Sequence, residues 1–404
     1  MADLTKQRLS DVFRVPRAGR YSSPENTGEA LPLPYGDLTT IQGVERGVYL
    51  CPKIDTAGAG TWCVAGHAIH GSVKLFDADG LIDPGDYTLN PANDYQGKGV
   101  IATAAFSVAP NQFVEAICKG KKDASGNLIE SPALLAEELL LNLWGFAEQD
   151  VDRRTLSLVY ERFAALGYKA AGVIGEDHAP QEVLQSLLGN FLASFDVDPN
   201  GRVSFNALGA ETGALYPALY VPSREIAAWG DWDLASVVNQ VPARYGKNFS
   251  PSDGEMKRHD DGEATKDAAS QILYGVRLPA QGRLELPWVR DQASARTIQA
   301  RIVERMKEPA RVVEISDPSF RCIRAEEGDY VAFTVEWMRT AHLEPLVNQI
   351  GQVMSLSPDL NGQGVTLRFR DTGYWLTTAR ILDGSWTLGG GVLLGGQRDT
   401  AIYA

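Results

Sequence analysis

The chain has 404 residues, of which 44% are hydrophobic and 22% are charged, a balance typical of a soluble globular protein with about two to four domains. Its formal net charge is −13, from 51 acidic and 38 basic residues, which disfavours tight binding to nucleic-acid phosphates. The sequence contains no apolar run long enough to predict a membrane span. The polar N-terminus lacks the hydrophobic segment of a secretory signal. We therefore expect a protein that is used, or assembled into a particle, in the cytoplasm.

The first part of the chain divides into an irregular stretch and a β-like stretch. Residues 1–45 are rich in Pro, Gly and Ser and show little periodicity, which predicts an arm or linker that is either packed on a neighbouring subunit or disordered. Residues 46–125 predict a β domain, because turn-forming residues separate short apolar runs. These runs lie at 49–51, 62–65, 73–76, 100–103 and 113–117. Their spacing is typical of an antiparallel barrel or sandwich.

The segment 126–210 predicts a helical or mixed domain. Ser131 followed by Pro132 is a typical helix start. Helices are expected at about 131–144, 154–166 and 180–193, and a tight turn at 196–201 should lead from the third helix into a strand. The apolar faces assigned to the three helices are Leu134, Leu135, Leu139, Leu143 and Trp144; Leu158, Phe163 and Leu166; and Val183, Leu184, Leu187, Leu188 and Phe191.

The second half of the chain is predicted to be richer in strands. Residues 211–283 form a β-rich segment in which the polar run 247–268 reads as an exposed loop. In the C-terminal domain, 284–404, Asp291 should cap an amphipathic helix. The helix should bury Ala295, Ile298, Ile302 and Met306, and strands should follow at 312–315, 330–335, 347–354 and 365–369. The predicted class is α+β: a β-rich multidomain protein with barrel-like domains and helical insertions.

The cysteines predict neither a disulfide framework nor a cluster. They lack the C-x-x-C spacing of zinc and iron–sulfur sites, so we expect reduced, mostly buried thiols. A zinc set could be drawn from Cys51, Cys63, His67 and His70, which lie within twenty residues of one another. However, the two histidines are three apart in a predicted strand and would point to opposite faces. We expect no metal and no cofactor.

A calcium loop is the second metal hypothesis. The run Asp196-x-Asp198-x-Asn200-Gly201 matches the first half of such a loop. The twelfth position, which should be a bidentate Glu, is Ala207. Because the strongest ligand is missing, we interpret this run as a turn between a helix and a strand.

No catalytic arrangement stands out. Cys63 with His178 or His342 could act as a cell-wall peptidase, but no nucleophile motif surrounds any cysteine. Glu137 and Glu138 are adjacent, so on a helix they face different directions and should be solvated. Trp229, Trp232, Trp375 and Trp386 could form a sugar-binding platform, with core or interface packing as the alternative. We expect a protein that is not an enzyme.

The order of features from 286 to 369 resembles that of hub proteins from tailed bacteriophages. In that unit a helix beginning Asp-x-x-x-Ala leads into strands, a Gly-Asp turn and a closing hairpin. The matching pieces are Asp291 to Ala295, Gly328-Asp329-Tyr330-Val331, Leu346-Val347-Asn348-Gln349-Ile350-Gly351 and Gln363-Gly364-Val365-Thr366-Leu367-Arg368-Phe369-Arg370. Three earlier landmarks resemble tail proteins of siphophages: Leu33-Pro34-Tyr35-Gly36-Asp37, Ala65-Gly66-His67-Ala68-Ile69, and the run 118–132.

The resemblance implies a structural role in a virion. It implies β-barrel domains that ring a central channel, in a homotrimer at the tail tip that is assembled in the host cytoplasm. Partners would be other tail proteins, namely distal tail, tape-measure and fibre or central tip proteins, and DNA would pass through the channel without specific binding. A carbohydrate- or receptor-binding virion module is the alternative function, ahead of the cysteine peptidase.

Overall fold

The computed structural model divides the chain into two compact units, each built from segments that are separated in the sequence. The first comprises Met1–Phe205, Pro242–Ala264 and Gln281–Gln299, and the second comprises Asn206–Val241, Thr265–Ala280 and Ala300–Ala404. The division into five consecutive segments stays a prediction. The structure describes residues 2–21, 27–40, 48–198, 200–207, 219–221, 226–229, 233–249, 256–258, 264–317, 322, 325, 329–339, 345–359, 364–376 and 394–397.

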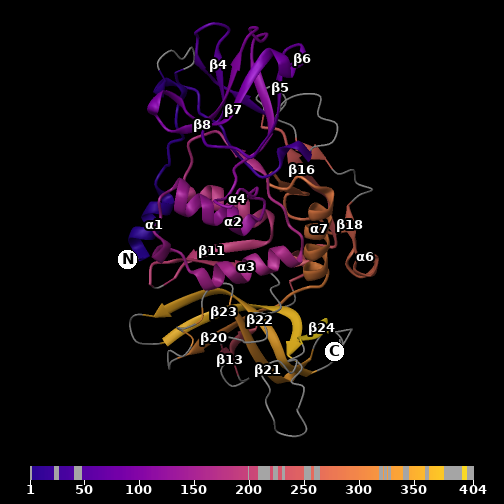
Figure 1. The fold of residues 1–404 in the computed structure, drawn as a ribbon. Helices are drawn as coiled ribbons and strands as arrows, with labels where there is room; N and C mark the ends of the chain where they lie inside the picture. Colours follow the sequence, from indigo (N-terminus) through magenta and orange to yellow (C-terminus); the bar gives the residue numbers. More distant parts are fainter. Residues whose placement is uncertain are drawn as a thin grey trace. The chain divides into compact units, whose positions relative to one another are not determined.

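The β domain of the first unit consists of two four-stranded antiparallel sheets around one core (Figure 1). One sheet has the order β2 (Tyr49–Cys51), β9 (Val114–Lys119), β5 (Gly71–Asp77) and β6 (Gly80–Leu81). The other has the order β3 (Lys53–Asp55), β4 (Thr61–Ala65), β8 (Val100–Phe106) and β7 (Tyr87–Asp94). All five predicted strands are confirmed. β7 was not predicted, because it is an edge strand, mostly exposed, whose sequence contains Asn and Pro.

Three helices follow the β domain in the chain, at the positions that the apolar periodicity predicts. They are α2 (Pro132–Glu138), continued by a π-helical turn at Leu139–Leu143, α3 (Arg153–Ala165) and α4 (Pro180–Asn190). Two predicted core residues are in fact exposed, Leu134 at 39% and Leu158 at 50%. The buried face of α3 is instead Leu156, Val159 and Phe163, whose spacing of three and four residues fits one helical stripe.

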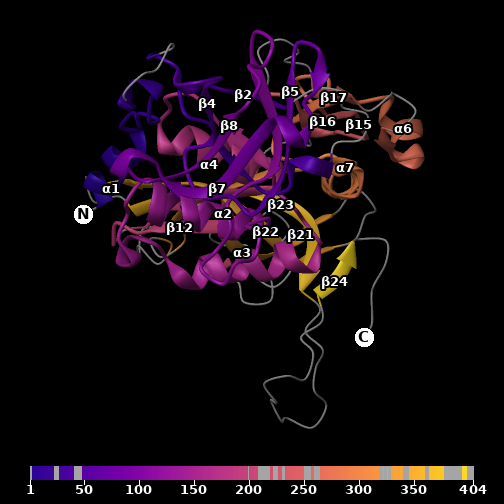
Figure 2. The same cartoon turned by 45° about the horizontal axis from the view of Figure 1, so that its top comes forward.

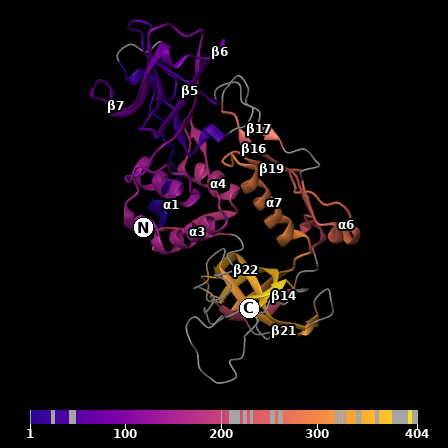
Figure 3. The ribbon, with the colours of Figure 1, turned by 45° about the vertical axis from the view of Figure 1, so that its right-hand side comes forward.

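The N-terminal residues belong to the first unit instead of leaving it as an arm. Helix α1 (Ala2–Ser10) contacts α4 and β11 (Ala193–Val197) (Figure 3). The Thr5 hydroxyl donates to the Gly201 carbonyl at 2.6 Å, and Arg8 pairs with Asp150 at 3.1 Å. Leu9, Val15, Ala18, Tyr21 and Leu31 are buried. The described residues of this stretch are therefore packed on their own chain.

Three small sheets complete the described part of the first unit, one of them the pair of β11 with β12 (Val203–Ala207). β1 (Leu33–Tyr35) pairs with β10 (Gly172–Ile174). β16 (Ala243–Lys247) pairs antiparallel with β17 (Met256–Arg258) and parallel with β19 (Leu284–Leu286); β16 and β17 lie side by side in Figure 2. β17 corrects the prediction of a loop at 247–268, because it donates and accepts backbone hydrogen bonds within a sheet.

The second unit is built on a seven-stranded sheet, most of which Figure 3 shows in orange and yellow. The order is β13 (Leu219–Val221), β21 (Tyr330–Arg339), β22 (Pro345–Asp359), β23 (Gly364–Leu376), β20 (Val312–Asp317) and β14 (Ile226–Trp229), with β24 (Leu394–Gln397) also on β23. The four predicted C-terminal strands are confirmed, and β22 and β23 are longer than expected. They pair from Asp359 and Gly364 back to Gln349 and Trp375. The glycines at 389–391 lie outside the described residues.

The remaining elements link these sheets. α7 (Gln292–Met306) begins in the segment of the first unit and ends in that of the second. Its predicted cap is confirmed, since Asp291 Oδ1 accepts from Ser294 N at 2.7 Å. Ala295 and Ile298 are fully buried, whereas Ile302 and Met306 are only partly buried. In the second unit, β15 (Gln240–Val241) pairs with β18 (Thr265–Lys266), which is followed by α6 (Ala268–Tyr274).

Short 3₁₀ turns punctuate both units, at η1 (Ala18–Arg20), η2 (Leu38–Thr40), η3 (Pro84–Asp86), η4 (Tyr95–Gly97), η6 (Glu148–Asp150) and η8 (Leu234–Ser236). None of the helices in the described part of the chain combines the length and the apolar character needed to cross a bilayer. The class predicted from the sequence, α+β and rich in strands, is confirmed.

Candidate functional site

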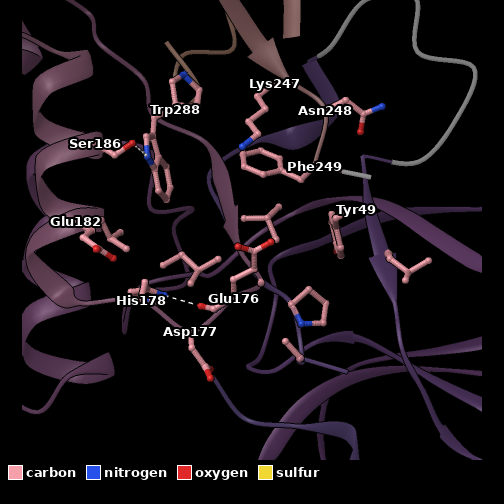
Figure 4. Close-up of a pocket in the computed structure, with 18 of the residues that line it drawn as sticks. Tyr49, Glu176, Asp177, His178, Glu182, Ser186, Lys247, Asn248, Phe249 and Trp288 are labelled. Carbon is pink, nitrogen blue, oxygen red and sulfur yellow. Dashed lines mark hydrogen bonds between the residues drawn. The ribbon is translucent and has the colours of Figure 1, made fainter. Parts of the chain in front are cut away.

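A cavity of about 710 Å³ lies within the first unit and is the strongest binding-site candidate among the described residues (Figure 4). Five separate stretches of the chain form its wall: residues 29–32, 49–52 in and after β2, 173–186 from β10 into α4, 247–249 after β16, and 287–288 after β19. Aromatic and apolar side chains alternate there with charged ones, as is typical of ligand pockets.

Trp288 is the most firmly held residue of this wall. Its indole Nε1 donates to Ser186 Oγ at 3.1 Å, its backbone N donates to Asn190 Oδ1 at 2.9 Å, and its carbonyl accepts from Ala171 N at 2.9 Å (Figure 4). The ring lies against Gly172, where a Cβ would come within 2.5 Å of it. A side chain at position 172 would displace the indole, so glycine is required for this close approach.

Two of the four acidic residues that line the cavity, Asp177 and Glu182, have structural roles. Asp177 accepts from Val15 N at 2.9 Å and pairs with Arg17 at 2.7 Å. The hydrogen bond from Val15 is the main cause of the lowered pKa of Asp177. Glu182 Oε2 accepts from Ala179 N at 3.1 Å, which caps the start of α4. These carboxylates anchor the N-terminal stretch and a helix end.

The cavity wall holds no nucleophile paired with a base among the described residues. The Ser186 hydroxyl is occupied by Trp288. His178 Nδ1 lies 2.7 Å from the Glu176 carbonyl, and its ring packs against Phe13 and Trp144 (Figure 4). The arrangement of side chains in this wall can bind a ligand.

The structure separates the four residues of the zinc hypothesis by environment. Cys51 lies in β2 and Cys63 in β4, and both thiols are buried. His67 and His70 lie in the connection between β4 and β5 and not in a strand, which corrects the reason given above for their opposite directions. His67 is largely buried, whereas His70 is exposed. Within the described part of the chain, no group of three metal-ligating side chains comes together.

Burial makes the thiols poor nucleophiles. All four cysteines are free and buried, which confirms the prediction of reduced thiols. Burial raises the pKa of the Cys63 thiol far above its usual range and the pKa of Cys118 to about 12. Cys63 packs among Ile54, Ile101 and the N-terminal stretch. A protonated thiol in that core does not fit the peptidase hypothesis; His342, its second proposed base, lies outside the described residues.

The calcium-like run forms a turn closed by an ion pair. Asp198 is only 5% exposed and receives hydrogen bonds from Arg202 N and Nε, both at 2.8 Å, and its Oδ2 lies 2.7 Å from Arg202 Nη2. The turn joins β11 to β12 (Val203–Ala207), so it connects two strands and not a helix to a strand. α4 ends early, at Asn190, which leaves room for β11.

The remaining candidate residues from the sequence, two glutamates and four tryptophans, either have structural roles or have side chains outside the described part of the structure. Glu137 pairs with Arg153 and Glu138 pairs with Lys121, so they are not simply solvated as predicted. Trp232 and Trp386 lie outside the described residues, and the side chains of Trp229 and Trp375 are also outside the description. The sugar-platform alternative therefore stays a prediction.

Sequence reasoning missed the cavity and the basic residues beside it, Lys247 and Arg290. The cavity wall comes from stretches far apart in the sequence, and no local pattern marks it. Arg290 directly follows the apolar residues Pro287, Trp288 and Val289, and a charged residue at that position is the one signal that could have singled it out.

No family model matches the sequence, and no curated protein matches it. Among solved structures, the chain is similar to the tail protein from Neisseria meningitidis MC58, with a TM-score of 0.34 and 12% identity over 71% of this chain and 79% of that one. It is also similar to prophage tail protein gp18 from Listeria monocytogenes EGD-e, with a TM-score of 0.30 and 11% identity over 72% and 78%.

A third similar structure is the 43 kDa tail protein of prophage MuSo2 from Shewanella oneidensis. Its TM-score is 0.35, with 9% identity over 84% of this chain and 88% of that chain. At these TM-scores, the three structures do not define a common fold for the whole chain.

Proposed function

We propose that the chain is a structural component of a bacteriophage tail, specifically a ring-forming hub subunit at the tail tip. It would link the tail tube to the receptor-binding or penetration apparatus around a DNA channel. The observation that carries this proposal is the order of elements β19, α7, β20, β21, β22 and β23 along the chain. That is the succession of helix, strands and closing hairpin in which the sequence resembles phage hub proteins.

The sheet of the second unit supports an assembling role. Its path ends at β13 on one side and β14 on the other, and these strands do not pair with each other among the described residues. An open sheet edge presents backbone donors and acceptors that a neighbouring subunit can use. The net charge of −13 suits a channel wall that must not hold DNA.

Locating the chain within intact phage particles tests the proposed function directly. A gold-labelled antibody against the chain should mark the end of the tail in electron micrographs of intact particles. The purified chain, or its complex with tail partners, should form a closed ring, with a trimer expected from light scattering. Label along the whole tail would contradict the tip assignment, and a monomer absent from every particle would overturn the tail role.

We also propose that the chain is not an enzyme. The buried, protonated thiol of Cys63 and the structural roles of Glu137 and Glu138 support this. Purified protein should leave peptidoglycan intact, with the Cys63→Ala variant as the matched control. Release of peptidoglycan fragments by the natural chain but not by Cys63→Ala would overturn this part of the proposal.

A further inference from the structure

Arg290 is a buried arginine in which only one of the three guanidinium nitrogens has a hydrogen-bond partner among the described residues. The residue is 5% exposed and lies just before the capping Asp291. Its Nη1 donates to the Lys247 carbonyl at 2.6 Å. Its Nε and Nη2 are both buried and have no hydrogen-bond partner among the described residues. Buried arginines are rarely left in this state, because an uncompensated charge and unpaired donors both cost free energy.

The two unused donors form one geometric unit. In a guanidinium group, the Nε–H and one Nη–H point the same way, so together they can donate two parallel hydrogen bonds to a carboxylate. The chain contains an occupied example of this edge: Arg202 directs Nε and Nη2 at Asp198 Oδ2, at 2.8 and 2.7 Å. In Arg290 the same edge has no carboxylate among the described residues.

The nearest carboxylate in the sequence is engaged elsewhere. Asp291 Oδ1 accepts from Ser294 N at 2.7 Å, and its other oxygen is buried without a partner. Asp291 and Arg290 therefore form no ion pair, although they are adjacent. Burial lowers the pKa of Arg290 to about 9, which leaves the guanidinium charged at pH 7.

A second cation beside the cavity adds to the positive charge. The Arg290 guanidinium lies 5.2 Å from the centre of the Phe249 ring, and Lys247 Nζ lies 5.1 Å from the same ring. Figure 4 shows Lys247 directed at the Phe249 ring, at the edge of the cavity. Among the described residues, Lys247 has no ion pair. Two cations around one ring, without an anion, repel each other and would both be stabilised by one.

We propose that Arg290 and Lys247 form a binding site for a carboxylate that comes from outside this chain. The Nε and Nη2 donors of Arg290 would hold its two oxygens, and Lys247 would supply the second positive charge. The carboxylate would enter from the cavity past the Phe249 ring. It would belong either to a small molecule or to an acidic side chain of a second copy of this chain, and both sources present the same group.

The cavity favours a small carboxylate over a polyanion. Glu29, Glu176, Asp177 and Glu182 also line it, and they would repel a ligand with several negative charges. Asp177 and Glu182 are already engaged by Arg17 and by the start of α4. This site does not depend on the proposed tail role, and its failure would leave that role untouched.

Thermal unfolding of the full chain tests the small-molecule source, with sodium acetate as the probe and sodium chloride of equal ionic strength as the reference. Acetate should raise the unfolding midpoint of the natural chain by a few degrees. Arg290→Met should abolish this rise, because methionine fills the space without donors. Arg202→Met is the matched control, since its edge already holds Asp198, and it should keep the acetate response.

Sedimentation of the same proteins tests the second source. If another copy supplies the carboxylate, the natural chain should self-associate, while Arg290→Met should not, and acetate should compete with the association. The proposal is overturned if neither acetate binding nor self-association depends on Arg290.

Discussion

Two arginines of the first unit, the partly exposed Arg202 and the buried Arg290, have their charges compensated to different degrees. Arg202 follows Asp198 by four residues, so the turn itself brings a carboxylate to its guanidinium. Arg290 is more deeply buried, yet among the described residues its only hydrogen bond is to a backbone carbonyl. The first arrangement is complete within a few residues and stabilises a hairpin. The second is incomplete among the described residues, which is the pattern expected where a partner arrives from elsewhere.

The largest expected effect comes from breaking the complete pair. Arg202→Met should lower the free energy of unfolding by about 2 kcal/mol, because it leaves the Asp198 carboxylate buried with fewer donors. Arg290→Met should change stability little or raise it, because it removes an uncompensated buried charge. Chemical denaturation of both variants at pH 7 checks the contrast, and equal losses would remove the distinction between the two sites.

The ion pair between Arg202 and Asp198 should also affect how the free energy of unfolding depends on pH in the acid range. Burial alone raises the pKa of Asp198, but the hydrogen bonds from Arg202 N and its guanidinium outweigh burial, so the pKa lies below its ordinary value. Its contribution to stability is therefore present above the unfolded pKa of about 4 and is lost as the pH falls below it. In Arg202→Met the folded pKa of Asp198 should move back toward its unfolded value, so the loss of stability in acid should be smaller, as measured by urea unfolding at a series of pH values.

A third titratable group, His67, differs from both arginines because its environment favours the neutral form. Burial is the main cause that lowers the pKa of His67 to about 4, and its Nε2 has no partner among the described residues. Because the folded pKa lies below the unfolded value of about 6.5, its contribution is complete above pH 6.5 and is lost as the pH falls toward 4. The natural chain should lose on the order of 2 kcal/mol across this window.

A His67→Gln variant checks this effect. Its free energy of unfolding should depend less on pH between 6.5 and 4, whereas His70→Gln, at an exposed position, should behave like the natural chain. An unchanged slope in His67→Gln would mean that another group titrates there.

Sequence reasoning predicted the elements better than the site. The five strands from 49 to 117 and the cap at Asp291 follow from local alternation and capping, which need no knowledge of distant residues. The N-terminal stretch looked like a free arm, because its contacts with Gly201 and Asp150 are long-range. That Arg290 Nε and Nη2 have no partner within the described part of the chain is a property of three-dimensional packing that no residue pattern records.

A smaller change tests whether Trp288 keeps the Arg290 site in place. Gly172→Ala should force the indole away, because the added Cβ would lie 2.5 Å from it, at a cost of about 1–2 kcal/mol. Near-ultraviolet circular dichroism should report the moved tryptophan. The acetate response should weaken, since Trp288 is two residues from Arg290, while the Asp198 turn should be unaffected. The matched control is Gly189→Ala, where an added Cβ meets no atom within 4 Å.

The smallest expected effect comes from Asp291→Asn, which tests whether Asp291 is the counter-ion of Arg290. Asp291→Asn keeps an oxygen that can accept from Ser294 N, and asparagine caps helices about as well as aspartate. Only the favourable interaction of the carboxylate with the helix dipole is lost, so the free energy of unfolding should fall by about 0.5 kcal/mol. The acetate response should persist or increase, because one competing negative charge is gone. A loss several times larger, with no acetate response in the natural chain, would mean that Arg290 already has its carboxylate, and the two arginines would then be alike.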